Sequence, residues 1–137
     1  MSLFVDTSAF YALSDNGDQS HARATERLAV EEQLVTTDHV LLETWMLIDK
    51  RGGHAPAESF WQTIRAGTAR VEHVTPADLD AAWRIGEAFA DQEFSLVDRT
   101  SFAVMERLGV HRALAFDDDF AVYRFGPRRR HAFEVLR

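Results

Sequence analysis

Short apolar runs that stop at an acidic residue are the feature that most constrains the fold of this chain. Leu3-Phe4-Val5 ends at Asp6, and Ala113-Leu114-Ala115-Phe116 ends at Asp117. Such runs are typical of strands that are buried on both faces in a parallel sheet. We expect three further short strands, at residues 34–36, 71–74 and 133–136.

Helical patterns fill the intervals between these strands. Thr75-Pro76-Ala77-Asp78 combines a capping threonine, a proline at the first helical position and an acid three residues after the threonine. Ser95-Leu96-Val97-Asp98 repeats the capping pattern. We expect the main helices at residues 18–32, 38–52, 57–66, 76–90 and 96–108. This alternation predicts an α/β fold, a single domain over residues 1–137, with a mainly parallel central sheet of four to five strands flanked by helices.

Composition excludes several classes of protein. The 137 residues are 46% hydrophobic and 27% charged, which is typical of an ordinary folded domain. The absence of cysteine excludes a disulfide scaffold, a thiolate zinc site and a cysteine nucleophile, and it favours a cytoplasmic location. No apolar run reaches the length of about 18 residues that spans a bilayer, so no membrane partner is expected. The formal charge of −7 argues against a general nucleic-acid coat protein, but not against a nuclease whose carboxylates hold cations.

Four acids stand at positions that favour a shared site. Asp6 and Asp117 follow strands, and ligands bind at the carboxyl ends of parallel strands. Glu43 projects from the apolar side of its helix, and Asp98 lies in a first helical turn. Two such charges about 4 Å apart repel by roughly 4 kcal/mol at an effective dielectric constant near 20, so protons or cations must neutralise a converging group. Oxygen ligands without cysteine favour Mg²⁺ or Mn²⁺, which promote phosphodiester hydrolysis.

Each acid also has an ordinary structural explanation. Asp6 alone is compatible with a turn, Asp98 with a helix cap, and Glu43 with a salt bridge to an arginine or to Lys50. Asp117 and the two aspartates after it are compatible with a solvated loop or with a helix start. The presence of all four in one chain favours the shared site over these separate explanations.

An ordered set of segments gives the chain a resemblance to a known family. The chain resembles PIN domains, specifically the VapC-like ribonuclease toxins of bacterial type II toxin–antitoxin pairs. The similarity covers essentially the whole chain, in order and in spacing. The segments that carry it are Phe4-Val5-Asp6-Thr7-Ser8-Ala9-Phe10, Asp18-x-x-His21-x-x-Ala24, Leu42-Glu43-Thr44, Ser95-Leu96-Val97-Asp98-Arg99-Thr100-Ser101-Phe102 and Ala115-Phe116-Asp117-Asp118-Asp119-Phe120.

The resemblance implies roles for the acids. Asp6, Glu43, Asp98 and Asp117 match the catalytic, metal-binding quartet, and Asp119 matches a less regular acidic position beside a second ion. We interpret Asp6 and Asp98 as the main ligands of one Mg²⁺, with Mn²⁺ as the alternative. The resemblance also implies RNA as the substrate, endonucleolytic cleavage that leaves 5′-phosphate and 3′-hydroxyl ends, a homodimer, and a small antitoxin partner.

Three further positions are candidates for contacts with the substrate. Ser8 matches a family hydroxyl that orients Asp6 or a bound water. Arg99 adjoins Asp98, and it either contacts a substrate phosphate or balances the acidic site. The run Arg128-Arg129-Arg130 either binds RNA phosphates or is a solvated terminal segment.

Two other functions stay open on the sequence alone. One is a catalytically silent PIN-like module that binds RNA or a protein. The other is a Mg²⁺-dependent phosphoryl-transfer domain, which the sequence favours less. A phosphatase of that class needs Asp-x-Asp at its first strand, where this chain has Asp6-Thr7-Ser8, and a receiver domain needs a late lysine, whereas Lys50 is the only lysine.

Overall fold

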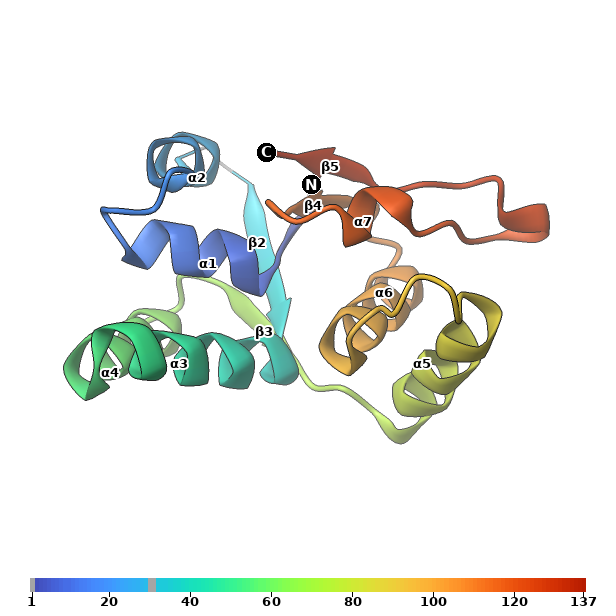
Figure 1. Ribbon diagram of the computed structural model, residues 1–137, viewed down its shortest axis with the longest axis horizontal. Helices are drawn as coiled ribbons and strands as arrows, with labels where there is room; N and C mark the ends of the chain where they lie inside the picture. The colour runs from blue at the N-terminus through green and yellow to red at the C-terminus, as the bar shows by residue number, and fades with distance from the viewer. Residues whose placement is uncertain (1, 30–31) are drawn as a thin grey trace.

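The computed structural model describes residues 2–29 and 32–137 (Figure 1). Within this part of the chain, five parallel strands form one sheet in the order β3-β2-β1-β4-β5, which confirms the predicted α/β class. The strands are β1 (Ser2–Val5), β2 (Gln33–Thr37), β3 (Arg70–Glu72), β4 (Arg112–Leu114) and β5 (Glu134–Leu136).

The most apolar strand, β1, lies at the centre of the sheet. In β1, Leu3, Phe4 and Val5 are at most 1% exposed, because β2 and β4 flank the strand and helices cover both faces. Phe4 lies in register with Val35 of β2 and with Ala113 of β4. The chain proceeds from β1 to β2 and β3 in one direction and then returns to β4 on the other side of β1. The boundary between β1 and β4 is therefore the topological switch point, where parallel α/β sheets bind ligands.

Helices fill the two layers beside the sheet (Figure 1). On one side, α1 and α3 pack together, with α2 against α1 and α4 against α3, while α5 and α6 pack together on the other. None of the helices in the described ranges is long and apolar enough to cross a membrane. The helices are α1 (Thr7–Ser14), α2 (His21–Leu28), α3 (Asp38–Gly52), α4 (His54–Arg65), α5 (Pro76–Ala88), α6 (Leu96–Leu108), α7 (Asp119–Val122) and the 3₁₀ turn η1 (Pro127–Arg129).

The helix predicted from residue 18 begins later than expected. The Asp18 carboxylate accepts the N–H of Ser20, and the Asp18 carbonyl accepts the N–H of His21, so the chain turns before α2 starts at His21. Aspartate favours such local turns over the helix interior. The predicted end of this helix includes residues 30 and 31, which lie outside the described residues.

An aromatic cluster fills the core between the sheet and α6. Phe102 of α6 stacks on Tyr123, with ring centroids 4.4 Å apart and planes 9° apart, and it meets Phe120 of α7 edge-on at 4.9 Å. Phe120 in turn lies 6.1 Å from Phe4 of β1. These contacts fix α6 and α7 against the central strand, and both helices carry acidic residues at their N-terminal ends.

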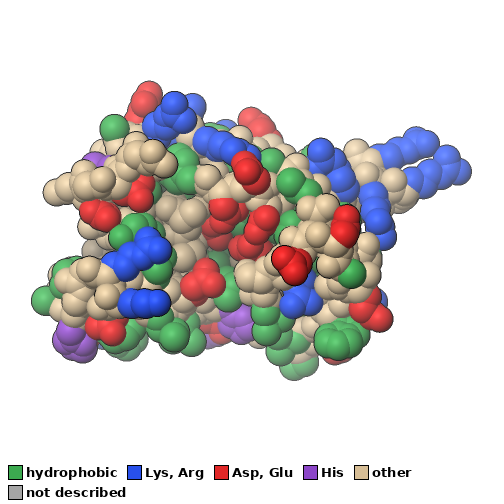
Figure 2. All heavy atoms as spheres, in the orientation of Figure 1, with side chains coloured by type: hydrophobic (Ala, Val, Ile, Leu, Met, Phe, Trp, Pro, Cys, Tyr) green, Lys and Arg blue, Asp and Glu red, His purple; other side chains and the backbone are tan. Residues whose placement is uncertain are grey.

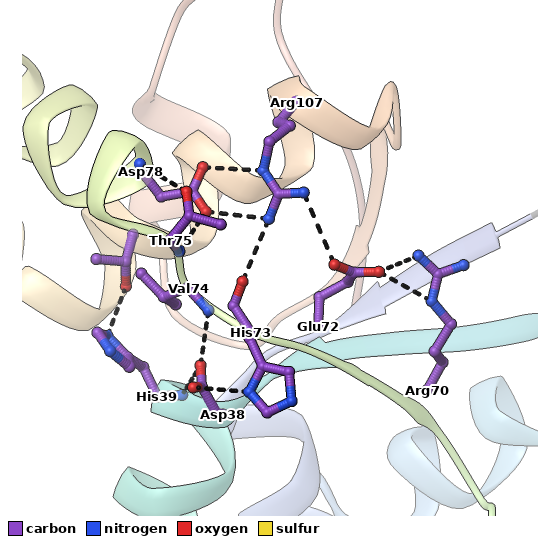
Figure 3. A network of polar contacts seen from close by, with 10 residues as sticks. Asp38, His39, Arg70, Glu72, His73, Val74, Thr75, Asp78 and Arg107 are labelled. Atoms are coloured by element: carbon purple, nitrogen blue, oxygen red, sulfur yellow. Dashed lines mark hydrogen bonds and ion pairs between the residues drawn. The ribbon is translucent and has the colours of Figure 1, made fainter.

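A polar network joins the segment after β3 to α6 (Figure 3). The buried carboxylate of Asp78 accepts two hydrogen bonds from Arg107, both 3.0 Å long, and one from the N–H of Thr75. Arg107 also donates to the His73 carbonyl and forms an ion pair with Glu72. Burial acts to raise the pKa of Asp78, but the hydrogen bonds from Arg107 and Thr75 outweigh it, so this pKa lies below its ordinary value.

Arg107→Ala should lower the free energy of unfolding by about 1.5 to 3 kcal/mol at pH 7, because it leaves the Asp78 carboxylate buried without its cation. Urea unfolding measures the loss. The difference in free energy of unfolding between the wild type and Arg107→Ala should become smaller as the pH falls below about 4, because a protonated Asp78 carries no charge for Arg107 to neutralise. Arg84→Ala, which removes an exposed arginine of α5, is the matched control and should change little. Equal stability of the two variants would contradict a structural role for this ion pair.

Candidate metal centre

Asp6 connects the central strand to α1. It is the N-cap of α1, with its backbone N–H donating to the Leu114 carbonyl of β4 at 3.1 Å. One carboxylate oxygen, Oδ2, accepts the Ser8 hydroxyl at 2.7 Å and the Ser8 N–H at 3.2 Å. The other oxygen, Oδ1, is buried and has no hydrogen-bond partner among the described residues. A buried carboxylate oxygen without a donor is costly unless a cation or a proton occupies it.

Ser8 links Asp6 to the loop that carries Asp117. While its hydroxyl donates to Asp6, its Oγ accepts the N–H of Phe116 at 2.9 Å. The strand β4 ends at Leu114, so two residues separate it from Asp117, rather than none as the apolar run predicts. The Ser8 hydrogen bonds hold this short extension beside the end of β1.

Asp98 approaches Asp6 and Asp117 from α6, on the opposite side of the sheet from α1. It lies in the first turn of α6, where its N–H donates to the capping Ser95 hydroxyl at 3.1 Å, and it is 7% exposed. Asp6, Asp98 and Asp117 each offer a carboxylate oxygen, and these three oxygens lie within 4.8 Å of one another. Figure 2 shows acidic side chains gathered near the centre of this face of the molecule.

Burial and mutual repulsion raise the pKa values of this group. Burial, followed by the charge of Asp117, raises the pKa of Asp6 to about 7. Burial, a hydrogen bond with Asp119 and the charges of Asp6 and Asp117 raise the pKa of Asp98 to about 9. Burial and the charge of Asp119 also raise the pKa of Asp117. Without a cation, Asp98 therefore retains its proton near neutral pH, and Asp6 retains its proton in part.

The donor set fits a hard divalent cation. All three candidate ligands are carboxylates, which Mg²⁺ and Mn²⁺ prefer, and Asp6 Oδ1 has no competing hydrogen bond. A cation at this position would replace the protons and offset both the cost of burying the charged carboxylates and their mutual repulsion. The three carboxylates therefore form a candidate site for a divalent cation.

Three other residues predicted from the sequence, Asp119, Glu43 and Arg99, differ in their position relative to the three carboxylates. Asp119 is the first residue of α7 and contacts Asp98. Glu43 lies half-buried on α3 and does not belong to the three-carboxylate group within the described residues. Arg99 reaches across to α5, where its guanidinium donates to the Ala82 carbonyl at 3.3 Å.

Gly86 explains the position of Arg99. A Cβ atom at Gly86 would lie 2.1 Å from Arg99 Nη1, so the glycine leaves room for the guanidinium in this position on α5. The sequence shows Arg99 beside Asp98, but neighbours on a helix point in different directions. In the structure, Arg99 joins α6 to α5.

Two buried hydroxyl groups, on residues close in sequence to Asp6 and Asp98, were not predicted as site residues from the sequence. Thr7 Oγ1 and Ser101 Oγ are buried and lack a hydrogen-bond partner among the described residues. Thr7 follows Asp6 directly, and Ser101 lies three residues after Asp98, on the same side of α6. That spacing is the only signal in the sequence that could have identified Ser101.

Comparison with known proteins identifies the family. The PIN domain family matches residues 3–126, so the chain belongs to the PIN domain family. A relative from Mycobacterium tuberculosis, the 23S rRNA-specific endonuclease VapC20, is 43% identical over 125 residues, which cover 90% of this chain and 95% of the relative. Ribonuclease VapC26 from the same species is 23% identical over 116 residues, which cover 84% of this chain and 86% of that protein.

Solved structures show the same fold. The crystal structure of Mycobacterium tuberculosis VapC20, described as a sarcin–ricin loop cleaving toxin, superposes with a TM-score of 0.80 at 40% identity and covers 85% of this chain and 91% of that one. VapBC2 from Rickettsia felis, bound to a promoter DNA fragment, has a TM-score of 0.66 at 11% identity over 87% of this chain and 90% of that one. At that identity, the similarity concerns the fold alone.

The raised carboxyl pKa values predict how stability depends on pH and metal. Because the folded protein keeps protons that the unfolded chain releases, the stability of the metal-free protein should fall as the pH rises from about 4 to 9. Asp98→Asn should flatten this decline and raise the free energy of unfolding at pH 8 by about 1 to 3 kcal/mol. Urea unfolding in EDTA and in excess Mg²⁺ measures both effects.

Asp80→Asn provides the control, because it removes an exposed carboxylate of α5 with no partner among the described residues. Mg²⁺ should stabilise the wild-type and Asp80→Asn proteins at pH 8 but stabilise Asp98→Asn much less. A pH profile that is the same for all three proteins would contradict the shared acidic site.

Proposed function

We propose that this chain is a divalent-metal-dependent endoribonuclease and the toxin of a type II toxin–antitoxin pair. The observation that carries the proposal is the convergence of Asp6, Asp98 and Asp117 at the switch point of the sheet, with one buried Asp6 oxygen free to bind a cation. Similarity to a protein named as a 23S rRNA-specific endonuclease supports RNA as the substrate.

We assign different roles in metal binding to the individual acidic residues. Asp6 and Asp98 would hold one Mg²⁺ or Mn²⁺, while Asp117 and Glu43 would complete the negative pocket through water or a second ion, which Asp119 would help to bind. When bound, the ion supplies positive charge to the scissile phosphate and to the water that attacks it. Ser8 fixes the Asp6 carboxylate through Oδ2, which leaves Oδ1 to the ion. The products carry 5′-phosphate and 3′-hydroxyl ends.

The raised pKa values couple metal binding to proton release. Asp98, with a pKa of about 9, is protonated at neutral pH in the metal-free protein. A carboxylate must be deprotonated to bind a metal, so uptake of the ion releases protons to solvent. Activity should therefore increase with pH over the neutral range at a limiting metal concentration.

Ribosomal RNA is the target that the comparisons favour. The relative at 43% identity is named for 23S rRNA, and the solved structure at 40% identity is described as a sarcin–ricin loop cleaving toxin. We infer that this chain cleaves the same loop of 23S rRNA, in the cytoplasm where ribosomes work.

The comparisons also support a protein partner for this chain. A toxin–antitoxin complex from Klebsiella pneumoniae has a TM-score of 0.61 at 12% identity, over 85% of this chain and 88% of that one. We infer a cognate antitoxin and a homodimer of this chain. Exposed large apolar side chains support such contacts, because they are typical of protein interfaces. They include Leu42 and Met46 of α3 and Trp83 of α5, which are 63%, 60% and 68% exposed.

Asp6→Asn should reduce metal-dependent RNA cleavage by at least about 100-fold, because even residues that support metal ligands cost 10–100-fold when changed. Asparagine also caps helices, so the fold should be kept. Mapping of new 5′ ends on total RNA, with Mg²⁺ and with EDTA, measures cleavage and locates the site. A folded Asp6→Asn protein that cuts at the wild-type rate would refute the proposed centre, and a wild-type protein that binds RNA without cutting would favour a silent PIN-like module.

Glu43→Gln should have a smaller effect, of about tenfold, because Glu43 lies outside the group that shares the ion directly. The same cleavage assay, repeated over a range of Mg²⁺ concentrations, separates weaker metal binding from slower chemistry. Glu87→Gln, at an exposed position of α5, is the matched control. A loss equal to that of Asp6→Asn would instead make Glu43 a direct ligand.

A further inference from the structure

The segment between α7 and β5 has a charge opposite to that of the rest of the protein. Residues 123–133 contain four arginines, Arg124, Arg128, Arg129 and Arg130, and no aspartate or glutamate. Removing these four positive charges from the formal charge of −7 leaves −11 on the other residues. Figure 2 shows Lys and Arg side chains gathered on a projection at one end of the molecule, where Figure 1 shows the red segment before β5.

The projection, residues 125–131, is a closed loop. Phe125 and His131 face each other across an antiparallel bridge, and each donates its N–H to the other's carbonyl at 3.0 Å. At the base, Phe125 stacks on Phe133 with ring centroids 4.8 Å apart. A Cβ at Gly126 would lie 2.4 Å from the His131 ring, so glycine is required for this close approach. The aromatic base joins the loop to the core cluster around Phe102 and Tyr123.

The tip of the loop has an unfavourable backbone. Arg128 and Arg129 have φ angles of 58° and 53°, in the left-handed region that residues with a Cβ seldom adopt. Such a conformation is strained for a residue with a Cβ, and strained residues concentrate at functional sites. Arg129 lies over the ring of Phe89, with its guanidinium carbon 4.6 Å from the ring centroid. The strain and this stacking hold three consecutive arginines on one exposed tip.

These arginines have no acidic partner within residues 2–29 and 32–137. Arg124 donates to the carbonyls of its own turn, while Arg128 and Arg130 are exposed and form no ion pair there. Arginines elsewhere in the chain do pair with acids, as Arg107 does with Asp78 and Arg137 with Asp118. The charge on the tip is therefore available to a ligand outside the chain.

We propose that the projecting loop binds the sugar–phosphate backbone of the RNA substrate, away from the bond that is cut. This inference rests on the proposed ribonuclease function. An acidic body repels RNA, so a basic extension beside a face where acidic side chains gather (Figure 2) provides attraction. The planar guanidinium binds phosphate with two hydrogen bonds, and such contacts position a nucleic acid without reading its sequence. The loop contributes affinity and orientation, and the acidic site performs the cleavage.

Binding measured without metal tests this proposal separately from catalysis. The probes are two fluorescent RNA hairpins, one with the sarcin–ricin loop sequence and one with a scrambled loop, titrated in EDTA at several salt concentrations. The triple variant Arg128→Ala, Arg129→Ala and Arg130→Ala should raise the Kd of both hairpins by at least about tenfold. The slope of log affinity against log salt should decrease by about 2 to 3. The lysine triple variant, which keeps the charge, should retain most of the slope.

A matched control removes the same charge elsewhere. Arg23, Arg65 and Arg84 are exposed and without partners among the described residues, and their triple alanine variant should bind RNA nearly as the wild type does. Thermal melting checks that each variant folds. Equal affinities of the two alanine triple variants would refute the proposal, and so would a loss of antitoxin binding with RNA affinity unchanged. If the wild-type protein cuts no RNA, the proposed function fails, and the binding data still decide whether the loop contacts RNA.

Discussion

Mutual repulsion among three carboxylates is the constraint on which the site depends. Asp6 and Asp98 are almost completely buried and share a space of less than 5 Å with Asp117, so their charges cannot coexist without protons or a cation. Burial first, and then the charges of neighbouring aspartates, raise the pKa values of all three groups. A fold that keeps such a group together at a cost in stability is consistent with a functional site, since structural aspartates elsewhere in this chain, such as Asp78, are paired.

The topology brings these acids together from three distant parts of the chain. Asp6 follows the central strand, Asp117 follows its neighbour β4 after a two-residue extension, and Asp98 comes from α6 in the opposite layer. Ser8 connects the first two through hydrogen bonds to Asp6 and from Phe116. The aromatic contacts of Phe102 and the ion pair of Arg107 fix α6, which sets the position of Asp98. Packing of α6 against the core therefore keeps Asp98 close to Asp6 and Asp117.

The sequence alone predicts the fold class and the main acidic residues, because local patterns encode both. The apolar run before Asp6 and the cap at Ser95 depend on neighbours a few residues away, and the structure contains the strand and the helix that they predict. The start of α2 was predicted wrongly because the local turn at Asp18 outcompetes the helix. The direction of Arg99 depends on the missing side chain of Gly86, 13 residues earlier, and the partner of Arg107 lies 29 residues away. Such long-range pairings leave no local signal.

Metal binding at the three carboxylates is tested most directly by a crystal structure of the protein soaked in Mn²⁺, with anomalous scattering to locate the ion. The account predicts one strong peak between Asp6, Asp98 and Asp117, with Asp6 Oδ1 and an Asp98 oxygen about 2.0–2.2 Å from it. It also predicts that the Ser8 hydroxyl still donates to Asp6 Oδ2. A map with no peak at this position, at Mn²⁺ concentrations that support RNA cleavage, would contradict the proposed centre.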